Sequence, residues 1–150
     1  MGLLQVIKSS PLFTELYDDE IEEIIKDCKV RCLEQNEILF RENDAGEDLF
    51  IVLTGELLIV KGGVTITKFN KGELLGELVL INDQQRTTSC CASVYTEVLI
   101  LNNKMIFGFY AKKPRLFSIL MMNIARMLAQ RLKKTTIEMK NLTDQLKKAS

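Results

Sequence analysis

Hydrophobic and polar positions divide the chain into three segments with different periods. In residues 1–28, apolar side chains recur every three or four positions, which is the spacing of one face of a helix. Ser9 or Ser10 can cap a helix there, and Pro11 suits a first helical turn. The pattern predicts two short helices with a break near Asp18. The apolar positions are Leu12, Phe13, Leu16, Ile21, Ile24 and Ile25.

Residues 29–101 change to the pattern of β-strands. Short runs rich in branched residues are separated by turn signals such as Thr54-Gly55 and Gly62-Gly63. The runs are EILF, DLFIVL, ELLIV, VTITKF, LVLI, SCCASV and EVLIL. Many short strands at even spacing predict a sandwich or jelly roll. The expected fold is therefore mainly β with flanking helices, of the α+β kind.

Residues 102–150 return to helical spacing. The stretch NNKMIFGFYA predicts one short helix, and a long helix is predicted over about 114–148, which holds neither Gly nor Pro after its start. Apolar positions in the long helix alternate in steps of four and three, which is the heptad spacing of a helix–helix seam. The seam consists of Met121, Ala125, Leu128, Leu132, Thr135, Met139, Leu142 and Leu146. A second line, Phe117, Leu120, Ile124 and Met127, would pack on the β domain.

The far half of this helix needs a partner, because so small a β domain cannot cover it. The simplest partner is a second copy of the chain, which predicts a parallel homodimer through the C-terminal helix. The alternative is a merely amphipathic helix.

Composition limits the classes of function. A chain of 150 residues that is 47% hydrophobic can bury one core, so we expect one domain with an appendage. Basic and acidic residues number 20 each, so no overall field attracts nucleic acid or a membrane surface. No apolar run approaches the roughly 20 residues that span a bilayer, and the first residues lack signal-peptide regions. These features predict a cytoplasmic protein.

Histidine is absent, which removes the commonest general base and the usual metal ligand. An enzyme is therefore not expected, and a cupin-type metal oxygenase least of all. The cysteines do not have the spacing of a zinc knuckle, and adjacent Cys90 and Cys91 would point to opposite faces of a strand. We expect buried reduced thiols and no metal. The other two cysteines are Cys28 and Cys32.

The stretch GELVLINDQQRTTS holds the candidate chemistry. Backbone N–H groups of Glu77 and Leu78 would open a short helical turn, which favours an anion. Arg86 can donate to two oxygens of one phosphate, and Thr87 adds a hydroxyl. Glu77 would repel phosphate but can accept a hydrogen bond from a sugar hydroxyl. The residues predict a ribose-phosphate pocket; the alternative is a surface ion pair beside a turn.

This stretch, within residues 75–89, resembles the phosphate-binding cassette of cyclic nucleotide-binding domains. The stretch ILFRENDAGEDLFIVLTGELLIV resembles that family's strand-turn-strand signature, and SSPLF is similar to the start of its N-terminal helices. The resemblance implies a cupin-like double-stranded β-helix as the jelly roll. It also implies that Arg86, Thr87 and the amides of Glu77 and Leu78 bind phosphate, and that Gly76 and Glu77 bind ribose.

Within the family, the chain is most similar to the bacterial cAMP receptor, or catabolite activator, type. The stretch QRLKKTTIEMKNL resembles the part of that type's dimer helix that closes over the bound base. The resemblance implies that Thr135 contacts the base, that Thr136 reaches the ligand of the other subunit, and that Arg131 pairs with Glu77. Thr135 also falls on the seam, where a polar residue has a second explanation as a device that sets helix register.

The resemblance extends to the pocket floor. Ile59 and Ile66 match positions that pack on ribose or base, with Thr67 beside them, although core packing alone would explain both isoleucines. Thr88 also belongs to the pocket and stands where the family usually has alanine.

The expected function is that of a homodimeric sensor of cyclic nucleotide whose ligand state is transmitted through the C-terminal helix. Thr135 favours cAMP, whereas Thr87 is compatible with cGMP. One alternative is a dimerisation module whose pocket is vestigial or takes another ligand, which Thr88 favours. Another is the sensor part of a longer transcription regulator, since the activator type continues into a DNA-binding domain. No nucleic-acid contact is expected from this chain alone, and the downstream effector is not predicted.

Overall fold

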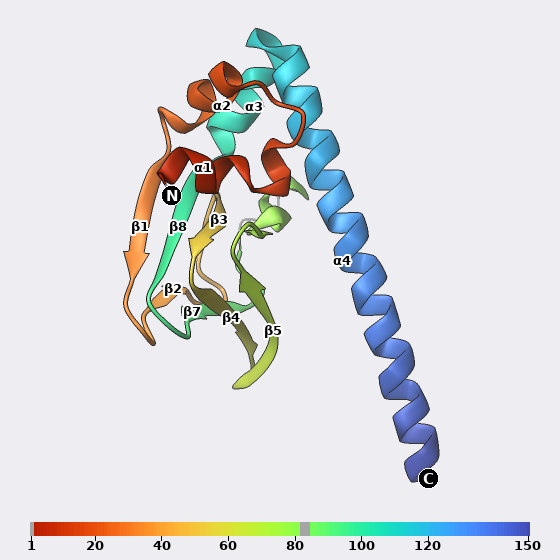
Figure 1. Cartoon of the computed structure of the whole chain (residues 1–150). Coiled ribbons are helices and arrows are strands. Elements are labelled where there is room, and N and C mark those ends of the chain that lie inside the picture. The colour runs from red at the N-terminus through yellow and green to blue at the C-terminus, as the bar shows by residue number, and fades with distance from the viewer. Residues whose placement is uncertain (1, 82–84) are drawn as a thin grey trace.

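Two antiparallel sheets form the centre of the molecule in the computed structural model, which describes residues 2–81 and 85–150 (Figure 1). Within these ranges each sheet has four strands. The first has the order β1-β8-β3-β6 and consists of β1 (Lys29–Leu33), β8 (Thr96–Asn102), β3 (Asp48–Thr54) and β6 (Leu74–Leu75). The second has the order β2-β7-β4-β5 and consists of β2 (Ile38–Phe40), β7 (Ser89–Ala92), β4 (Glu56–Lys61) and β5 (Val64–Asn70). The mainly β fold predicted from the sequence is confirmed.

Helices gather at one end of the sheets, and the longest one runs past them (Figure 1). The short ones are α1 (Leu3–Lys8), η1 (Pro11–Phe13), α2 (Asp18–Ile25), η2 (Glu77–Ile81) and α3 (Asn103–Lys112). Helix α4 (Pro114–Ala149) has 36 residues, or about 54 Å at 1.5 Å per residue. Its C-terminal half projects away from the sheets, and residues 132–150 are all exposed. The predicted long helix is therefore present.

Hydrophobic side chains form two cores, one on each side of the first sheet. Strand β3 contributes to both, since Phe50 and Val52 face the second sheet while Leu49, Ile51 and Leu53 face the helices. Because successive side chains of a strand point to opposite faces, a strand covered on both sides is apolar throughout. The core under the helices includes Leu116, Leu120 and Ile124 of α4. This confirms that one line of α4 packs on the β domain.

One expectation about the strands is wrong, and the expectation for the N-terminal helices holds only in part. The run LVLI lies in η2 rather than in a strand. Strand β6 ends at Leu75, and Gly76 turns the chain with φ 90°, so the run leaves the sheet. The first N-terminal helix is α1, and Pro11 begins only the single turn η1, whose N-cap is Ser10.

One prediction about the cysteines is also wrong. Cys90 is buried and Cys91 half-buried, as opposite faces of a strand require, but Cys32 is exposed. Cys32 precedes Leu33, which is buried in the core between the sheets, so alternation along β1 points Cys32 to the opposite face. None of the four cysteines is in a disulfide.

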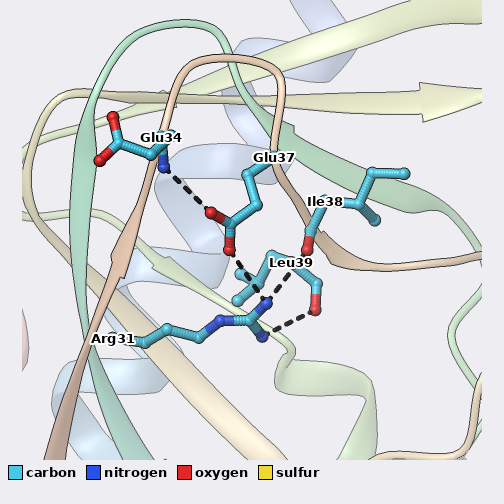
Figure 2. Close-up of polar contacts among 5 residues, drawn as sticks. All are labelled: Arg31, Glu34, Glu37, Ile38 and Leu39. Atoms are coloured by element: carbon cyan, nitrogen blue, oxygen red, sulfur yellow. Dashed lines mark hydrogen bonds and ion pairs between the residues drawn. The ribbon is translucent and has the colours of Figure 1, made fainter.

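An arginine joins the two sheets where β1 turns into β2 (Figure 2). The Arg31 guanidinium donates to the backbone carbonyls of Ile38 and Leu39 at 3.2 and 3.3 Å. It also lies 3.5 Å from the Glu37 carboxylate, which accepts a bond from the backbone N–H of Glu34 at 3.2 Å. Since β1 and β2 belong to different sheets, these bonds stabilise the closed edge of the roll.

No helix in the described part of the chain is long and apolar enough to cross a membrane.

Candidate functional site

A cavity of about 210 Å³ opens between the second sheet, the turn before η2 and helix α4. Residues from separate parts of the sequence line it, including most of the predicted site. The lining consists of Phe40, Ile59, Thr67, Phe69, Leu75, Gly76, Glu77, Leu78, Gln85, Arg86, Thr87, Thr88 and Arg131. The roll therefore brings together both ends of the GELVLINDQQRTTS stretch, whose link residues 82–84 lie outside the described residues.

Arg86 is buried at the wall of this cavity, with 8% of its surface exposed. Its Nη2 donates to the backbone carbonyl of Asp48 at 3.0 Å, and its Cζ lies 4.6 Å from the centre of the Phe40 ring. Its Nε is buried and has no hydrogen-bond partner in the structure. Loss of hydration lowers the pKa of Arg86 from its ordinary value, although nearby acidic groups oppose the shift.

The buried guanidinium of Arg86 has no carboxylate partner among the described residues. Burying a cation without a partner is costly, and buried polar groups normally have hydrogen-bond partners. The side chain therefore has unused capacity for an anion at the cavity wall.

The turn before η2 places the other predicted phosphate and ribose groups. Gly76 has φ 90°, and its Cα lies so close to the Asp48 carbonyl that an added Cβ would stand 2.7 Å from that oxygen. Helix η2 begins at Glu77, so the amides of Glu77 and Leu78 belong to a first turn, where N–H groups lack partners within the helix. Glycine at position 76 thus allows the acid and both amides to approach the cavity.

Helix α4 reaches the same turn through Arg131. The guanidinium pairs with the Glu77 carboxylate, as the resemblance implied, and donates to the carbonyl of Leu74. Its Cζ also lies 4.7 Å from the centre of the Phe69 ring. One side chain of α4 therefore binds the rim of the cavity by charge, by a backbone hydrogen bond and by stacking.

The pocket floor agrees with the expectation at Ile59 and Thr67 but not at Ile66. Ile59 is 7% exposed and pairs with Thr67 across β4 and β5, and both line the cavity. Ile66 is 59% exposed and does not line the cavity, because it neighbours Thr67 on β5 and successive side chains of a strand point to opposite faces. It lines instead the adjoining hollow between β5 and α4. The expectation that Ile66 lies on the inner face with Thr67 is therefore wrong, although Ile66 does border a hollow next to the cavity.

The two threonines of α4 lie in different surroundings. Thr135 lines a second hollow of about 520 Å³ between β5 and α4, which shares Thr67, Phe69 and Arg131 with the cavity. Thr136 lines neither, and its hydroxyl donates to the Leu132 carbonyl at 2.9 Å. A single chain therefore offers Thr135 beside the cavity and directs Thr136 away from it.

Sequence reasoning missed two aromatic residues of the site, Phe40 and Phe69. Each faces a guanidinium, Phe40 that of Arg86 and Phe69 that of Arg131. Phe69 belongs to the core between the two sheets and Phe40 packs against that core, where an aromatic residue suggests only core packing. Their position against the arginines depends on the closure of the roll.

Metal ligands do not converge at the site. Within the described residues, no group of three His, Cys, Asp or Glu side chains is arranged to hold a metal ion.

Comparison with known proteins agrees with this geometry. The family model of the cyclic nucleotide-binding domain matches residues 30–113, more than half of the chain. The cyclic AMP receptor protein of Thermus thermophilus is 28% identical over 138 residues, which are 89% of this chain and 62% of the receptor. A cGMP-dependent protein kinase of Toxoplasma gondii is 28% identical over 111 residues, 74% of this chain and 11% of the kinase.

Solved structures show the same fold. The catabolite activator protein of Thermus thermophilus superposes with a TM-score of 0.73 at 27% identity, covering 89% of this chain and 63% of that protein. A cyclic nucleotide-binding domain from Methylobacillus flagellatus has a TM-score of 0.80 at 24% identity, covering 91% and 79% of the two chains. The chain thus spans under two thirds of the length of the receptor and the activator protein. On its sequence and its fold, it belongs to the cyclic nucleotide-binding domain family.

Proposed function

We propose that this chain is a sensor domain that binds a cyclic nucleotide, cAMP in preference to cGMP, and signals without chemical turnover. The observation that carries the proposal is the Arg86 guanidinium, which is buried at the wall of a cavity with an unpartnered Nε and, among residues 2–81 and 85–150, no carboxylate partner. A cyclic phosphodiester carries one negative charge and two free oxygens, which match one guanidinium.

Neighbouring groups extend the assignment from phosphate to sugar. Thr87 and the amides of Glu77 and Leu78 would add donors to the phosphate, and all three residues line the cavity. Glu77 already pairs with Arg131. A carboxylate can accept several hydrogen bonds, so the same group can also accept one from the ribose 2′-hydroxyl. Gly76 allows the sugar to approach the backbone.

Thr135 supports the preference for cAMP. It lines the hollow that adjoins the cavity beyond Arg131 and Thr67, on the side away from Arg86. A threonine hydroxyl can accept a hydrogen bond from the exocyclic amine of adenine. Guanine presents a carbonyl at the equivalent position, to which the same hydroxyl would have to donate, so the preference for cAMP rests on this contact together with the similarity to the cyclic AMP receptor protein. Ile59 and Thr88 complete the apolar and polar walls of the cavity.

Homodimerisation is part of the proposal. The seam of α4 is uncovered in the single chain, with Leu132 68%, Leu142 59% and Leu146 72% exposed. A second copy in parallel orientation would cover this line and bring Thr136 of one subunit towards the ligand of the other. The heptad spacing of the seam supports such a pairing.

Arg131 offers the route of transmission. Since it binds Glu77 from α4, a ligand that engages Glu77 changes the free energy of one placement of α4 relative to another. Ligand state would thereby alter the geometry of the dimer.

A second candidate is a dimerisation module whose pocket has lost its ligand. The cavity volume of about 210 Å³ is below the roughly 300–1,000 Å³ of typical ligand pockets, and Thr88 occupies part of its wall. In either case, the chain can be the sensor part of a longer regulator. No DNA contact is assigned to these residues.

Isothermal titration calorimetry with cAMP and with cGMP tests the proposal. We expect both to bind, with cAMP the tighter ligand, and we expect Arg86→Ala to weaken cAMP binding by about tenfold or more, because a charged hydrogen bond is lost. Arg126→Ala is the matched control, since Arg126 lies on α4 outside the cavity. Binding of cAMP by the Arg86→Ala protein within about twofold of the unchanged chain would disprove the phosphate role. No heat and no thermal shift with either nucleotide would favour the dimerisation module.

A further inference from the structure

Gly46, in the turn before β3, is a glycine that the backbone does not require. It is absent from the glycines with positive φ, so any residue could adopt its conformation. An added Cβ would nevertheless lie 2.6 Å from Nη2, 2.7 Å from Nε and 2.8 Å from Cζ of Arg86. These are the three nearest atoms, and all are closer than a real Cβ contact allows. A larger residue at position 46 would therefore require the Arg86 guanidinium to move from its place.

Other walls hold the same guanidinium from different directions. The centre of the Phe40 ring lies 4.6 Å and that of the Phe50 ring 5.4 Å from its Cζ, and the two rings stack on each other. The Asp48 carbonyl accepts from Nη2 at 3.0 Å. An added Cβ at Gly76 would lie 3.0 Å from Nη1. We call this enclosure of Gly46, Phe40, Phe50, Asp48 and Gly76 the arginine niche.

The niche fixes a long side chain before any ligand arrives. An arginine side chain that moves freely loses entropy when it is ordered, and a side chain that is already ordered does not lose it again on binding. Cation–π contacts with the rings contribute further to holding the guanidinium in place.

We propose that Gly46 and Phe40 are positioning residues that preset the Arg86 guanidinium for the phosphate of the ligand. This inference rests on the proposed function, and it adds a role that acts through Arg86: Gly46 lies outside the cavity lining, and Phe40 belongs to the lining and also holds the guanidinium. Gly46 leaves the space that the guanidinium occupies, and Phe40 provides the surface on which it lies.

Gly46→Ala is the test, because it adds one methyl group at a position where the backbone accepts alanine. The methyl group displaces the guanidinium, and we expect cAMP affinity to fall by about tenfold, the loss of one well-placed charged hydrogen bond. Gly108→Ala is the matched control, since nothing lies within 4 Å of its added Cβ. We expect the control to bind within about twofold of the unchanged chain. Equal affinities of the two variants would overturn the inference.

A double-mutant cycle separates positioning from a general structural effect. In an Arg86→Ala background there is no guanidinium to displace, so Gly46→Ala should cause no further loss of affinity. Phe40→Leu keeps an apolar side chain but removes the ring, and it should likewise cause no further loss of cAMP affinity in the Arg86→Ala background. Additive losses in the cycle would mean that Gly46 and Phe40 act on the cavity independently of Arg86, against the inference.

Nuclear magnetic resonance of the ligand-free protein gives a readout that needs no nucleotide. The Arg86 Nε–H proton should show slow exchange with water, because Nε is buried, and a shift caused by the Phe40 ring. Gly46→Ala should abolish both features, whereas Gly108→Ala should preserve them. If the unchanged chain binds neither cAMP nor cGMP, the proposed function fails. In that case the Nε–H resonance still tests whether Gly46 positions Arg86. If Gly46→Ala leaves this resonance unchanged, the inference about Gly46 is wrong.

Discussion

Asn123 is the buried polar residue whose replacement gives the clearest test of how α4 is attached. It lies on α4 with 2% of its surface exposed, and its Nδ2 donates to the carbonyls of Leu12 and Thr14, both at 2.8 Å. These bonds fasten η1 to α4. On its other side, η1 is fastened to the β domain, because the Ser10 hydroxyl donates to the Gly72 carbonyl at 3.0 Å.

Asn123→Ala removes both bonds. Two neutral hydrogen bonds contribute about 0.5–1.5 kcal/mol each, and an unpaired buried carbonyl costs about 1–3 kcal/mol. Leu12 is 1% exposed, so its carbonyl stays buried without a partner, whereas Thr14 is exposed and its carbonyl can bind water. We therefore expect the free energy of unfolding to fall by about 2–3 kcal/mol. For a domain of this size that lowers the Tm by about 5–10 °C.

Urea and thermal unfolding followed by circular dichroism measure the change. Asn141→Ala is the matched control, because Asn141 is exposed on the same helix and its replacement should change stability by under about 0.5 kcal/mol. All variants are compared at one protein concentration, since dimerisation makes the Tm concentration-dependent. If the two variants unfold within about 0.5 kcal/mol of each other, the bonds of Asn123 do not hold η1 to α4.

Three further predictions concern the seam, the rim of the cavity and the thiols. Leu142→Glu should convert the proposed dimer to a monomer in analytical ultracentrifugation, because it places a charge in the uncovered line of α4; an unchanged dimer would exclude this seam. Glu77→Gln should weaken cAMP binding in calorimetry by about tenfold, since it removes the charge that pairs with Arg131 and accepts from the sugar; unchanged affinity would exclude the ribose role. Exposed Cys32 should react first with an aromatic disulfide reagent at pH 8, and Cys90 only on unfolding, because burial raises the pKa of Cys90 from 9.0 to about 12. Because of this shift, the Cys90 thiol keeps its proton in both the folded and the unfolded chain below about pH 9, and only the unfolded chain loses it as the pH rises towards 12. Stability should therefore decline over that range, and decline less in Cys90→Ala; rapid labelling of Cys90 in the folded protein would contradict the assignment.

Local pattern was sufficient for most of the elements. The runs DLFIVL and ELLIV predict β3 and β4 to within a residue at each end, and the long stretch without Gly or Pro predicts α4. Such segments can be read from the sequence because period and branching depend on near neighbours. The run LVLI has the same composition as a strand, but it lies in η2, since the turn at Gly76 carries it away from any pairing strand.

Some residues of the site can also be predicted from the sequence, and others cannot. Order and spacing in GELVLINDQQRTTS predict that Glu77 and Arg86 line one cavity, and the resemblance to the cAMP receptor type implies that Arg131 pairs with Glu77. Ile66 and Thr67 are neighbours on one strand, so alternation allows only one of them on the inner face, and the pairing of Thr67 with Ile59 decides that it is Thr67. Ile66 borders the hollow between β5 and α4, which the sequence could not show because that hollow exists only where the folded helix passes the strand.

Most helices and strands, their order and the chemistry of the acid, the arginine and the hydroxyls at the ends of one hydrophobic run can be predicted from the sequence. The enclosure of Arg86 by Phe40 and Gly46, and the attachment of η1 to α4 by Asn123 across more than 100 residues, are visible only in the folded chain. The physical reason is that propensity and period are properties of neighbouring residues along the chain. Enclosure and burial arise between residues far apart in sequence, and they exist only once the two sheets and α4 have closed around the cavity.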